Sequence, residues 1–288
     1  MTEREGAHPT AAAETAHRAE DITASKAMMP AFQLTMLSVL GGIFISFAAI
    51  VSTAVTAGGG IAPGVARFLG GFVFSFGLIM VVIAGAELFS ANALLVVAAA
   101  SRRITVRRLL RCWGWIFVGN IVGTTLIATL MVVSGVYEAG DGSLGKRALE
   151  IAHSETSLAI PHAFVSGILA NTLVCVAVWM TFAAKTVSDK VLVIIPPVVI
   201  FVASGFQHLV AAFYSITAGL LLRAWVPDEF WTEIGMSSSS YPQLSWSRFV
   251  VHSMVPVTLG NLVGGGLLVG AMYWLTFLRD HAHSTDHA

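Results

Sequence analysis

A histidine interrupts one of the longest apolar stretches of the chain. Residues 191–225 are almost entirely apolar, but the short stretch 205–209, GFQHL, brings in a glycine, a glutamine and an imidazole. An ionisable side chain within a membrane-length segment is costly to bury, and it usually marks a substrate or proton pathway. We therefore predict a membrane pore or transporter with His208 at its centre. The alternative is a packed histidine bonded to a neighbouring helix, and the break at Gly205 argues against it.

A second interruption, at residues 85–90 (GAELFS), carries a carboxylate in place of the imidazole. Glu87 could act as a proton relay or a cation site. It could instead accept backbone N–H groups at the start of a half-helix, where the helix dipole favours negative charge, and we favour this interpretation. Ser90 follows one turn later and could bond either a freed backbone group or a molecule in the pore.

The composition places the protein in a membrane. Of its 288 residues, 56% are hydrophobic and 11% are charged, whereas soluble domains carry about 25% charged residues. The apolar runs are continuous, which predicts helices rather than the alternating strands of a barrel. The net charge is zero, so nothing favours a nucleic-acid partner. The sequence contains no hydrolase or transferase constellation, and we expect neither an enzyme nor a bound metal or cofactor.

Six apolar segments fall into two groups of three. The second and fifth are too long for one regular crossing, because a bilayer core needs about 20 helical residues. A Gly-Asn-x-x-Gly motif recurs in the third and sixth segments, around Asn120 and Asn261. With three segments each, the two halves insert in opposite orientations. We therefore predict an all-α membrane domain built as an inverted 3+3 repeat, with segments two and five broken at a site near the midplane. The predicted segments are 32–55, 68–100, 112–135, 160–184, 191–225 and 249–278.

The lysines and arginines predict the orientation. With the N-terminus inside, eleven of these residues lie on the inner side and five on the outer side, so both termini are expected in the cytoplasm. We expect the chain to cross the cell inner (plasma) membrane. We divide it into a cytoplasmic N-terminal arm (1–30, helical over Ala11–Ala27), a transmembrane channel domain (31–279) and a cytoplasmic C-terminal tail (280–288).

Residues near the two breaks are candidates for supporting or pore-lining roles. Gly85 and Gly205 open the breaks. Asn120 and Asn261 can tie down the broken loops, because an amide both donates and accepts hydrogen bonds; Asn171 could do the same or face the pore. Apolar residues in a membrane protein usually face lipid or core, but some beside the breaks are candidate constrictions, namely Phe74, Leu78, Leu88, Phe89 and Phe201.

Four ordered motifs carry a resemblance to a known family. They are AGAELF at 84–89, GILAN at 167–171 continuing to AVWM at 177–180, FVASGF at 201–206 with His208, and VPVTLGN at 255–261 through Trp274. Over residues 30–279 the chain resembles the formate/nitrite transporter family, and within it the formate channels.

The resemblance implies a homopentamer in membrane lipid, in which each protomer has an aquaporin-like fold and its own pore. In this family, small monovalent anions or their conjugate acids pass two hydrophobic constrictions with a histidine between them. Carried over by motif, the central histidine is His208, and Ser90 takes the place of a threonine in the first break. The resemblance assigns the constrictions to Leu78 and Leu88 with Phe74 and Phe201. It assigns the supporting amides to Asn171 and Asn261.

The chain also departs from the family pattern. Gln207 stands where the family often has a glutamate before the histidine. The loop before the fourth segment usually carries a lysine near the outer vestibule, and Glu155 aligns there. A lysine would attract anions whereas a glutamate repels them, so this departure bears on substrate preference among formate, nitrite, acetate, lactate and hydrosulfide.

We expect formate, as anion plus proton, to be the leading substrate. The proton could pass on or through His208, or a neutral His208 could donate a hydrogen bond to the passing anion. One rival is a pore for a neutral solute such as water, glycerol or ammonia, but the Asn-Pro-Ala signatures of aquaporins are absent from the sequence. Another is a haem-binding redox subunit, which needs paired histidines on facing helices, whereas only His208 lies deep in an apolar segment.

Overall fold

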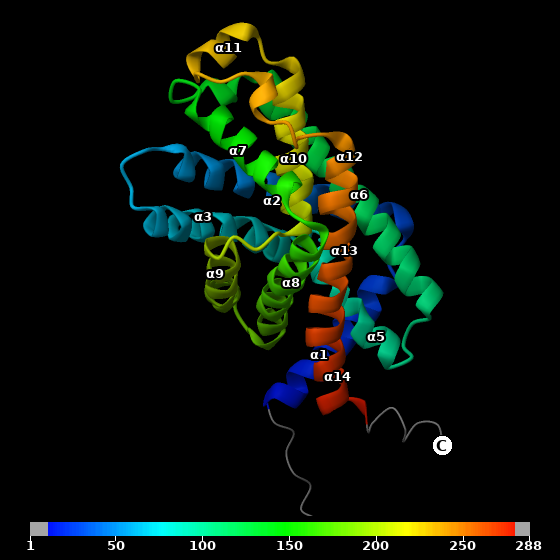
Figure 1. The fold of residues 1–288 in the computed structure, drawn as a ribbon. Coiled ribbons are helices and arrows are strands. Elements are labelled where there is room, and N and C mark those ends of the chain that lie inside the picture. Colours follow the sequence, from blue (N-terminus) through cyan, green and yellow to red (C-terminus); the bar gives the residue numbers. More distant parts are fainter. Residues whose placement is uncertain (1–10, 280–288) are drawn as a thin grey trace, which may run out of the picture.

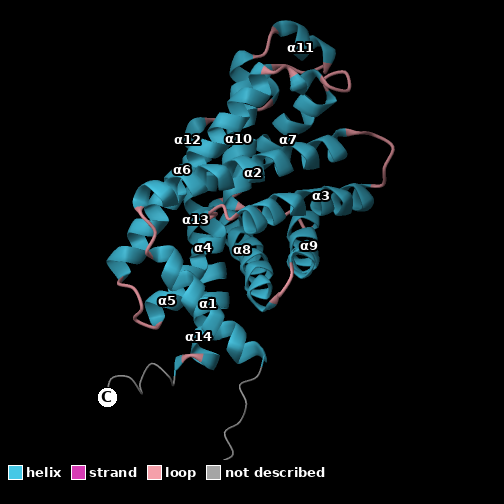
Figure 2. Cartoon of the chain, turned by 180° about the vertical axis from the view of Figure 1, so that it is seen from behind, coloured by secondary structure: helices cyan, strands magenta, loops and turns pink. Residues whose placement is uncertain are grey.

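The computed structural model of the protein describes residues 11–279, and all regular secondary structure in that range is helical (Figures 1 and 2). The C-terminal tail predicted at 280–288 lies outside the described residues. Five helices in the described range are long and apolar enough to cross a bilayer. They are α2 (Ala31–Ala57), α3 (Pro63–Ala84), α6 (Val106–Val133), α8 (Ile160–Ala183) and a composite helix over Trp246–Phe277.

The second and fifth predicted segments are each broken, as expected. In the second, irregular residues 85–88 follow α3. In the fifth, residues 204–208 separate two helices of 17 residues each. The parts after and around these breaks are α4 (Phe89–Asn92), η1 (Ala93–Leu95) and α5 (Val96–Ala100) in the first half, and α9 (Val187–Ala203) and α10 (Leu209–Trp225) in the second.

The last crossing is continuous but not uniformly α-helical. Two stretches are wound as π-helix, and the first of them ends two residues before Pro256, which has no backbone N–H and lies at the start of α13. The parts are α12 (Trp246–Arg248), η4 (Phe249–Met254), α13 (Val255–Asn261), η5 (Leu262–Ala271) and α14 (Met272–Phe277).

Some predicted boundaries were wrong by several residues. The third segment was predicted to begin near residue 112, but α6 begins at Val106, where the Thr105 side chain caps it by accepting from the Arg108 N–H at 3.2 Å. The prediction followed the apolar run alone, whereas the helix continues past that run into a basic end. Similarly, α3 begins at Pro63, five residues before the predicted start at 68.

The remaining elements lie at the two ends of the helical domain. At the end drawn uppermost in Figure 1 are α7 and α11; at the opposite end α1 lies with α5 and α14. The helix predicted over Ala11–Ala27 is confirmed as α1, and its alanines pack into the same core as the membrane helices. The bounds are α1 (Ala11–Ala27), η2 (Val136–Glu138), α7 (Ser143–Ser157), α11 (Asp228–Glu233) and η3 (Ser238–Ser240).

The two halves repeat the same helix packing. α6 packs on α2 in the first half as the composite helix packs on α8 in the second. The motif glycines make both contacts possible. A Cβ added at Gly123 would lie 2.1 Å from the Val39 carbonyl oxygen, and one at Gly264 would lie 2.2 Å from that of Ile168. Small residues at such contacts allow membrane helices to approach closely.

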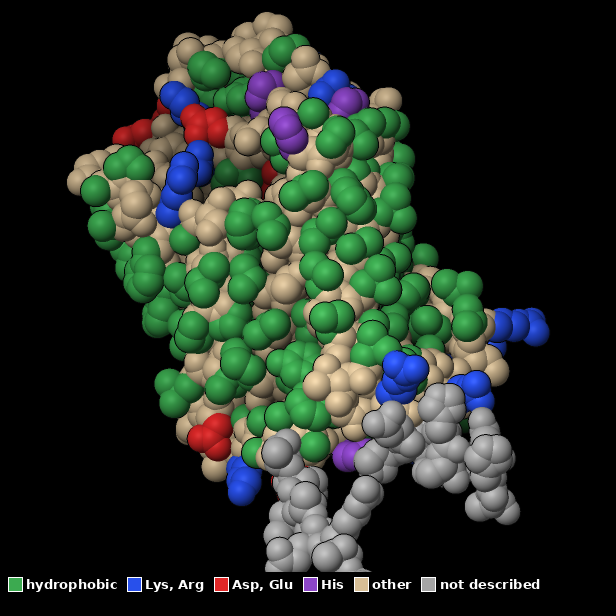
Figure 3. Space-filling model, turned by 60° about the horizontal axis from the view of Figure 1, so that its bottom comes forward, with side chains coloured by type: hydrophobic (Ala, Val, Ile, Leu, Met, Phe, Trp, Pro, Cys, Tyr) green, Lys and Arg blue, Asp and Glu red, His purple; other side chains and the backbone are tan. Residues whose placement is uncertain are grey.

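Charged and apolar side chains are segregated along the molecule. A belt dominated by hydrophobic side chains crosses the middle of the surface in Figure 3, and most charged groups lie beyond it. In each of the five long helices, only 39–50% of the residues in the most apolar 18-residue stretch are buried within the protomer. On α6, Val118, Val122, Leu126 and Leu130 form an exposed stripe with a spacing of four. Such faces need lipid or another protomer to cover them.

We predict that Gly123→Ala and Gly264→Ala each destabilise the protein, by about 1–3 kcal/mol, because the new methyl group forces two helices apart. Thermal unfolding of the detergent-purified protein measures the effect. Gly114→Ala is the matched control on α6, since no atom lies within 4 Å of its added Cβ. Equal melting temperatures for Gly123→Ala and Gly114→Ala would refute the close contact.

Candidate functional site

Both helix breaks begin with the same backbone turn. Gly85 and Gly205 have φ angles of 77° and 74°, in the left-handed region that disfavours a side chain. In each case the N–H of the next residue donates a hydrogen bond to the carbonyl five residues earlier in the chain. The Ala86 N–H donates to Val81 O at 2.9 Å, and the Phe206 N–H donates to Phe201 O at 3.1 Å. This arrangement ends the first half-helix and turns the chain sharply at membrane depth.

The buried Asn120 amide makes three hydrogen bonds around the first break. Asn120 Oδ1 accepts from the Phe89 N–H at 2.8 Å. Its Nδ2 donates to the carbonyls of Ser38 at 2.7 Å and Glu87 at 3.0 Å, and the Glu87 N–H donates to Leu37 O at 3.0 Å. Thus polar backbone groups that lipid cannot bond find partners inside the protein.

The second break is held by Ser166 and by the histidine itself. The Gln207 N–H donates to Ser166 Oγ at 2.8 Å. His208 caps α10, because its Nδ1 accepts from the Ala211 N–H at 3.2 Å. Its other ring nitrogen, Nε2, lies 2.7 Å from Ser90 Oγ, on the other broken segment. The two interruptions therefore meet through His208 and Ser90.

These contacts assign the tautomer of His208. A ring nitrogen that accepts a backbone N–H must carry a lone pair, so the proton of the neutral ring is on Nε2. Nε2–H then donates to Ser90 Oγ, and the Ser90 hydroxyl hydrogen is left to donate elsewhere. A second ring proton on Nδ1 would face the Ala211 N–H, so this cap holds the imidazole neutral.

Glu87 has different partners from those predicted. Its Oε2 accepts from Lys26 Nζ at 2.9 Å and from Asn92 Nδ2 at 2.8 Å, and no backbone N–H of the described residues reaches it. The expectation of backbone donors was wrong because Asn120 fills that role. The sequence also did not show that α1 would bring Lys26 to this carboxylate.

Cavities on the two sides of the breaks leave a closed apolar gap between them. A vestibule of about 520 Å³ on the α7 side reaches Phe74, Phe201 and His208. A vestibule of about 340 Å³ on the α1 side reaches Glu87 and Leu88. Between them lies a chamber of only about 10 Å³, around the lower limit for one water molecule. In this conformation the path is closed.

Apolar side chains from both halves line the small chamber. Phe74, Phe201 and His208 also line the α7-side vestibule, whereas Leu88 also lines the α1-side vestibule. The rings of Phe74 and Phe201 lie edge to face, with centroids 5.8 Å apart. His208 therefore lies at the edge of a hydrophobic plug, whose lining is Ile45, Phe74, Leu78, Leu88, Val174, Val198, Phe201 and His208.

Some predicted pore residues do not line this path. The Phe89 ring packs against Trp113 and Phe117 on α6, because residue 89 begins the helix after the break and turns its side chain away. Asn171 faces no described cavity; its Nδ2 donates to the carbonyls of Ser90 at 3.1 Å and Asn261 at 2.7 Å.

The remaining amide, Asn261, donates from Nδ2 to Gly167 O at 3.1 Å. Asn261 thus bonds a backbone carbonyl of α8 in the same way as Asn120 bonds a backbone carbonyl of α2. The chamber residues missed by sequence reasoning are Ile45, Val174 and Val198, which lie away from the breaks in sequence. Their apolar types carried no signal distinguishing them from lipid-facing neighbours.

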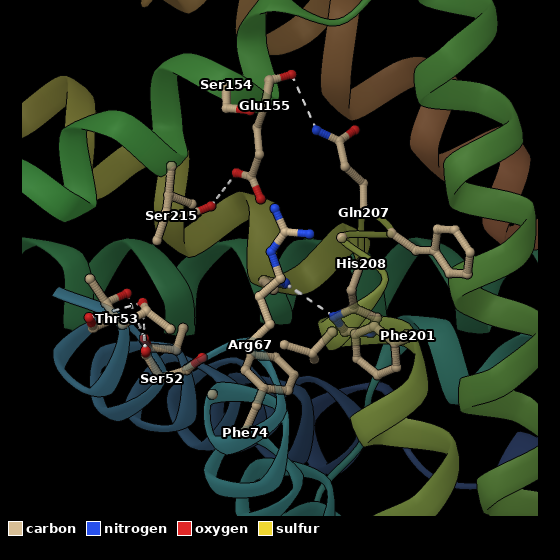
Figure 4. Close-up of a pocket in the computed structure, with 18 of the residues that line it drawn as sticks. Ser52, Thr53, Arg67, Phe74, Ser154, Glu155, Phe201, Gln207, His208 and Ser215 are labelled. Carbon is tan, nitrogen blue, oxygen red and sulfur yellow. Dashed lines mark hydrogen bonds between the residues drawn. The ribbon is translucent and has the colours of Figure 1, made fainter. Parts of the chain in front are cut away.

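Glu155 lies in the wall of the α7-side vestibule, near the C-terminus of α7 (Figure 4). Its carboxylate accepts a short hydrogen bond from the Ser215 hydroxyl, and its backbone carbonyl accepts from Gln207 Nε2 at 3.2 Å. Burial raises the pKa of Glu155 to about 7, while the Ser215 hydrogen bond acts in the opposite direction. Glu155 can therefore change its charge near neutral pH.

Two broken membrane helices that meet at a buried histidine, with a vestibule on each side, define a membrane channel or transporter. Comparison with known proteins gives the family. The model of the family described as formate/nitrite transporter matches residues 13–275. The chain belongs to this family, which consists of transporters rather than enzymes.

Known relatives match almost the whole chain. The formate channel FocA of Escherichia coli (strain K12) is 39% identical over 276 residues, covering 96% of each chain. The formate channel FocA of Haemophilus influenzae is 39% identical over 258 residues, covering 89% of this chain and 91% of the relative. A solved structure described as a pentameric formate channel with formate bound has a TM-score of 0.82 and 39% identity, and it covers 86% of this chain and 98% of that one.

We predict that Asn120→Ala destabilises the protein by about 2 kcal/mol or more, because it leaves buried backbone groups at the first break without partners. Thermal unfolding in detergent measures the loss. Thr129→Ala is the matched control, since Thr129 lies on the same helix and its hydroxyl donates to the exposed Thr125 carbonyl at 2.9 Å. Equal stability of the two variants would contradict this role for Asn120.

Proposed function

We propose that the protein is a pH-dependent channel or transporter for small monocarboxylates, with formate as the leading substrate, and that formate crosses as anion plus proton. Relatives named formate channels at 39% identity over nearly the full length support the substrate class. The observation that carries the mechanism is the His208–Ser90 contact of 2.7 Å, at the edge of an apolar chamber.

The chamber sets the physical problem. Desolvating a bare anion in an apolar medium costs tens of kcal/mol in the idealised limit. Protonating a weak acid costs about 1.4 kcal/mol for each pH unit above its pKa. The neutral acid therefore offers the lower barrier past the apolar side chains that line the chamber, among them Phe74, Leu78, Leu88 and Phe201. Formate is also small, which suits a path that closes to the size of one water molecule.

His208 acts in this proposal as a neutral hydrogen-bond donor. Its Nδ1 is occupied by the Ala211 N–H, so Nε2–H, which donates to Ser90 Oγ in this conformation, is the ring group available to a molecule leaving the vestibule. This geometry favours the donor version over protonation of the substrate by the imidazole. The proton then has to reach the anion from the vestibule.

The supporting residues follow from their bonds. Asn120, Asn171 and Asn261 hold the breaks and their neighbouring helices in register. Gly85 and Gly205 allow the chain to turn there.

We further propose that the protein is a homopentamer. The solved relative described as pentameric and the half-exposed apolar crossings support this assembly. Native mass spectrometry of protein extracted in mild detergent should give five times the 30.4 kDa chain mass, and a monomer alone would contradict it.

The proposed orientation puts α1, α14 and both termini in the cytoplasm. The arginines at 102–111 and Lys26 lie at the same end as α1, which supports that end as the inner side. A protease-sensitive tag at the C-terminus should be cleaved in inside-out vesicles and protected in intact spheroplasts.

We predict faster, proton-accompanied formate uptake into proteoliposomes at about pH 5 than at about pH 7.5, followed by tracer and by internal pH. His208→Phe should abolish this pH-dependent flux, because it removes the donor next to the chamber and the cap of α10. His162→Phe is the matched control, since His162 is exposed near the start of α8.

Two outcomes would contradict the proposal. Unchanged flux and pH dependence in His208→Phe would remove His208 from the path. If the wild-type protein moves no formate at either pH, the substrate is another small anion or a neutral solute.

A further inference from the structure

We propose that Glu155 is the group that loads the proton in the outer vestibule, and that an anion binds there only when this carboxyl is neutral. The inference rests on the proposed function, because it names the site at which proton and monocarboxylate enter together. The ligand class is a small carboxylate anion with one proton.

The first observation is that Glu155 and His208 share one cavity. Both line the α7-side vestibule of about 520 Å³, so an anion that reaches His208 from this side must pass the Glu155 carboxyl. The Gln207 side chain links the two directly, because its Nε2 bonds the Glu155 carbonyl and the next residue is His208. An ionised carboxylate in this space would repel a second anion.

The second observation is that Glu155 has no cationic partner. No Lys or Arg nitrogen of the described residues lies within the 4.0 Å of an ion pair. Within the part of the chain that the structure describes, its carboxyl accepts a hydrogen bond from the Ser215 hydroxyl and from no other group. A half-buried carboxylate without a counter-charge favours the neutral form. The raised pKa of about 7 agrees with this environment.

The third observation is that a cation in the same vestibule is uncommitted. Arg67 on α3 extends into the vestibule in Figure 4 and forms no ion pair within the described residues. Arg147, in contrast, is paired with Glu150 at 3.1 Å. Arg67 can attract the anion while Glu155 holds the proton, so the vestibule offers a place for each.

The other titratable groups around α7 are accounted for. α2 carries none. On α10, Arg223 donates to Leu244 O, and Tyr214 is buried. On the last crossing, Arg248 donates to Thr156 O at 2.9 Å and His252 Nδ1 lies 3.2 Å from Leu158 O.

Three more titratable groups lie on neighbouring surfaces. Tyr137 and Glu138 belong to η2, and the Tyr137 carbonyl faces Gly145 near the other end of α7. His153, on α7 itself, packs edge to face against Tyr241 with centroids 5.6 Å apart. Within the described residues, the charges that face Glu155 across the vestibule are therefore those of Arg67, Arg147 and Glu150, with His208 at its floor.

The sequence of events balances in charge. Glu155 takes a proton from the outer solution and becomes neutral. A carboxylate anion then enters beside Arg67. The proton leaves the Glu155 oxygen for a carboxylate oxygen of the substrate, the neutral acid crosses the apolar chamber, and Glu155 is left ionised until the next proton arrives. One proton and one anion move per cycle.

The test is the ratio of wild-type to Glu155→Gln formate flux across pH. The ratio cancels the titration of formate itself and any contribution of His208. Because a group with a pKa of about 7 is mostly protonated at low pH, the ratio should be constant below about pH 6 and fall roughly tenfold by about pH 8. A ratio that stays flat over this range would overturn the inference.

Two further variants separate titration from a structural role. Ser215→Ala removes the hydrogen bond that favours the ionised form of Glu155. The ratio of Ser215→Ala flux to Glu155→Gln flux should therefore fall at a higher pH than the wild-type ratio does. Glu138→Gln is the matched control, since it removes an exposed carboxylate that lines neither vestibule, and its ratio to wild type should not change with pH. Identical shifts in Glu138→Gln and Glu155→Gln would also overturn the assignment.

A readout without transport distinguishes the two proposals. Infrared difference spectra of the full-length protein should show a carboxyl band that titrates near pH 7, is absent in Glu155→Gln, and moves to higher pH when formate is added. If formate flux depends on His208 but this band does not respond to formate, the inference fails and the proposed function stands. If the wild-type protein carries no formate, both fail.

Discussion

The rest of the structure depends on how the polar backbone is satisfied at two helix breaks in the membrane. Lipid offers no hydrogen bonds, so each freed N–H and C=O must find a partner within the protein. At the first break the partner is the Asn120 amide, and at the second it is Ser166 together with His208. The histidine is therefore part of the scaffold as well as of the chamber lining. Its cap on α10 decides which ring nitrogen carries the proton and where that proton points.

The inverted repeat turns one scaffold into two different chemical positions. In each half, the third residue after the left-handed glycine lies at the edge of the chamber: Leu88 follows Gly85 and His208 follows Gly205. The backbone turns are the same, but one half supplies an apolar side chain and the other a hydrogen-bond donor. Leu88 consequently faces the α1-side vestibule, whereas His208, together with Phe74 and Phe201, faces the α7-side vestibule.

The two vestibules handle charge differently. On the α1 side, Glu87 is neutralised by Lys26 at 2.9 Å, a pair that also fastens α1 to the first break. On the α7 side, Glu155 is held by a hydroxyl while Arg67 is free of ion pairs in the described part of the chain. A half-buried carboxylate without a counter-charge favours its neutral form, and burial raises the pKa of Glu155 to about 7. The two vestibules therefore differ in how their carboxylates are held.

Much of the architecture follows from the sequence alone, because hydrophobic length and glycine positions are properties of consecutive residues. Segment lengths predicted the crossings and both breaks, and Gly-Asn-x-x-Gly predicted the repeat. His208 was found because an imidazole at membrane depth is costly.

The tertiary structure decided what neighbours each side chain has. Helix rotation turned Phe89 onto α6 and brought Ile45, Val174 and Val198 to the chamber, and docking of α1 gave Glu87 its lysine. The contact between Glu155 and Ser215 has the same origin. Contacts between segments far apart in sequence depend on packing, which no local sequence pattern predicts.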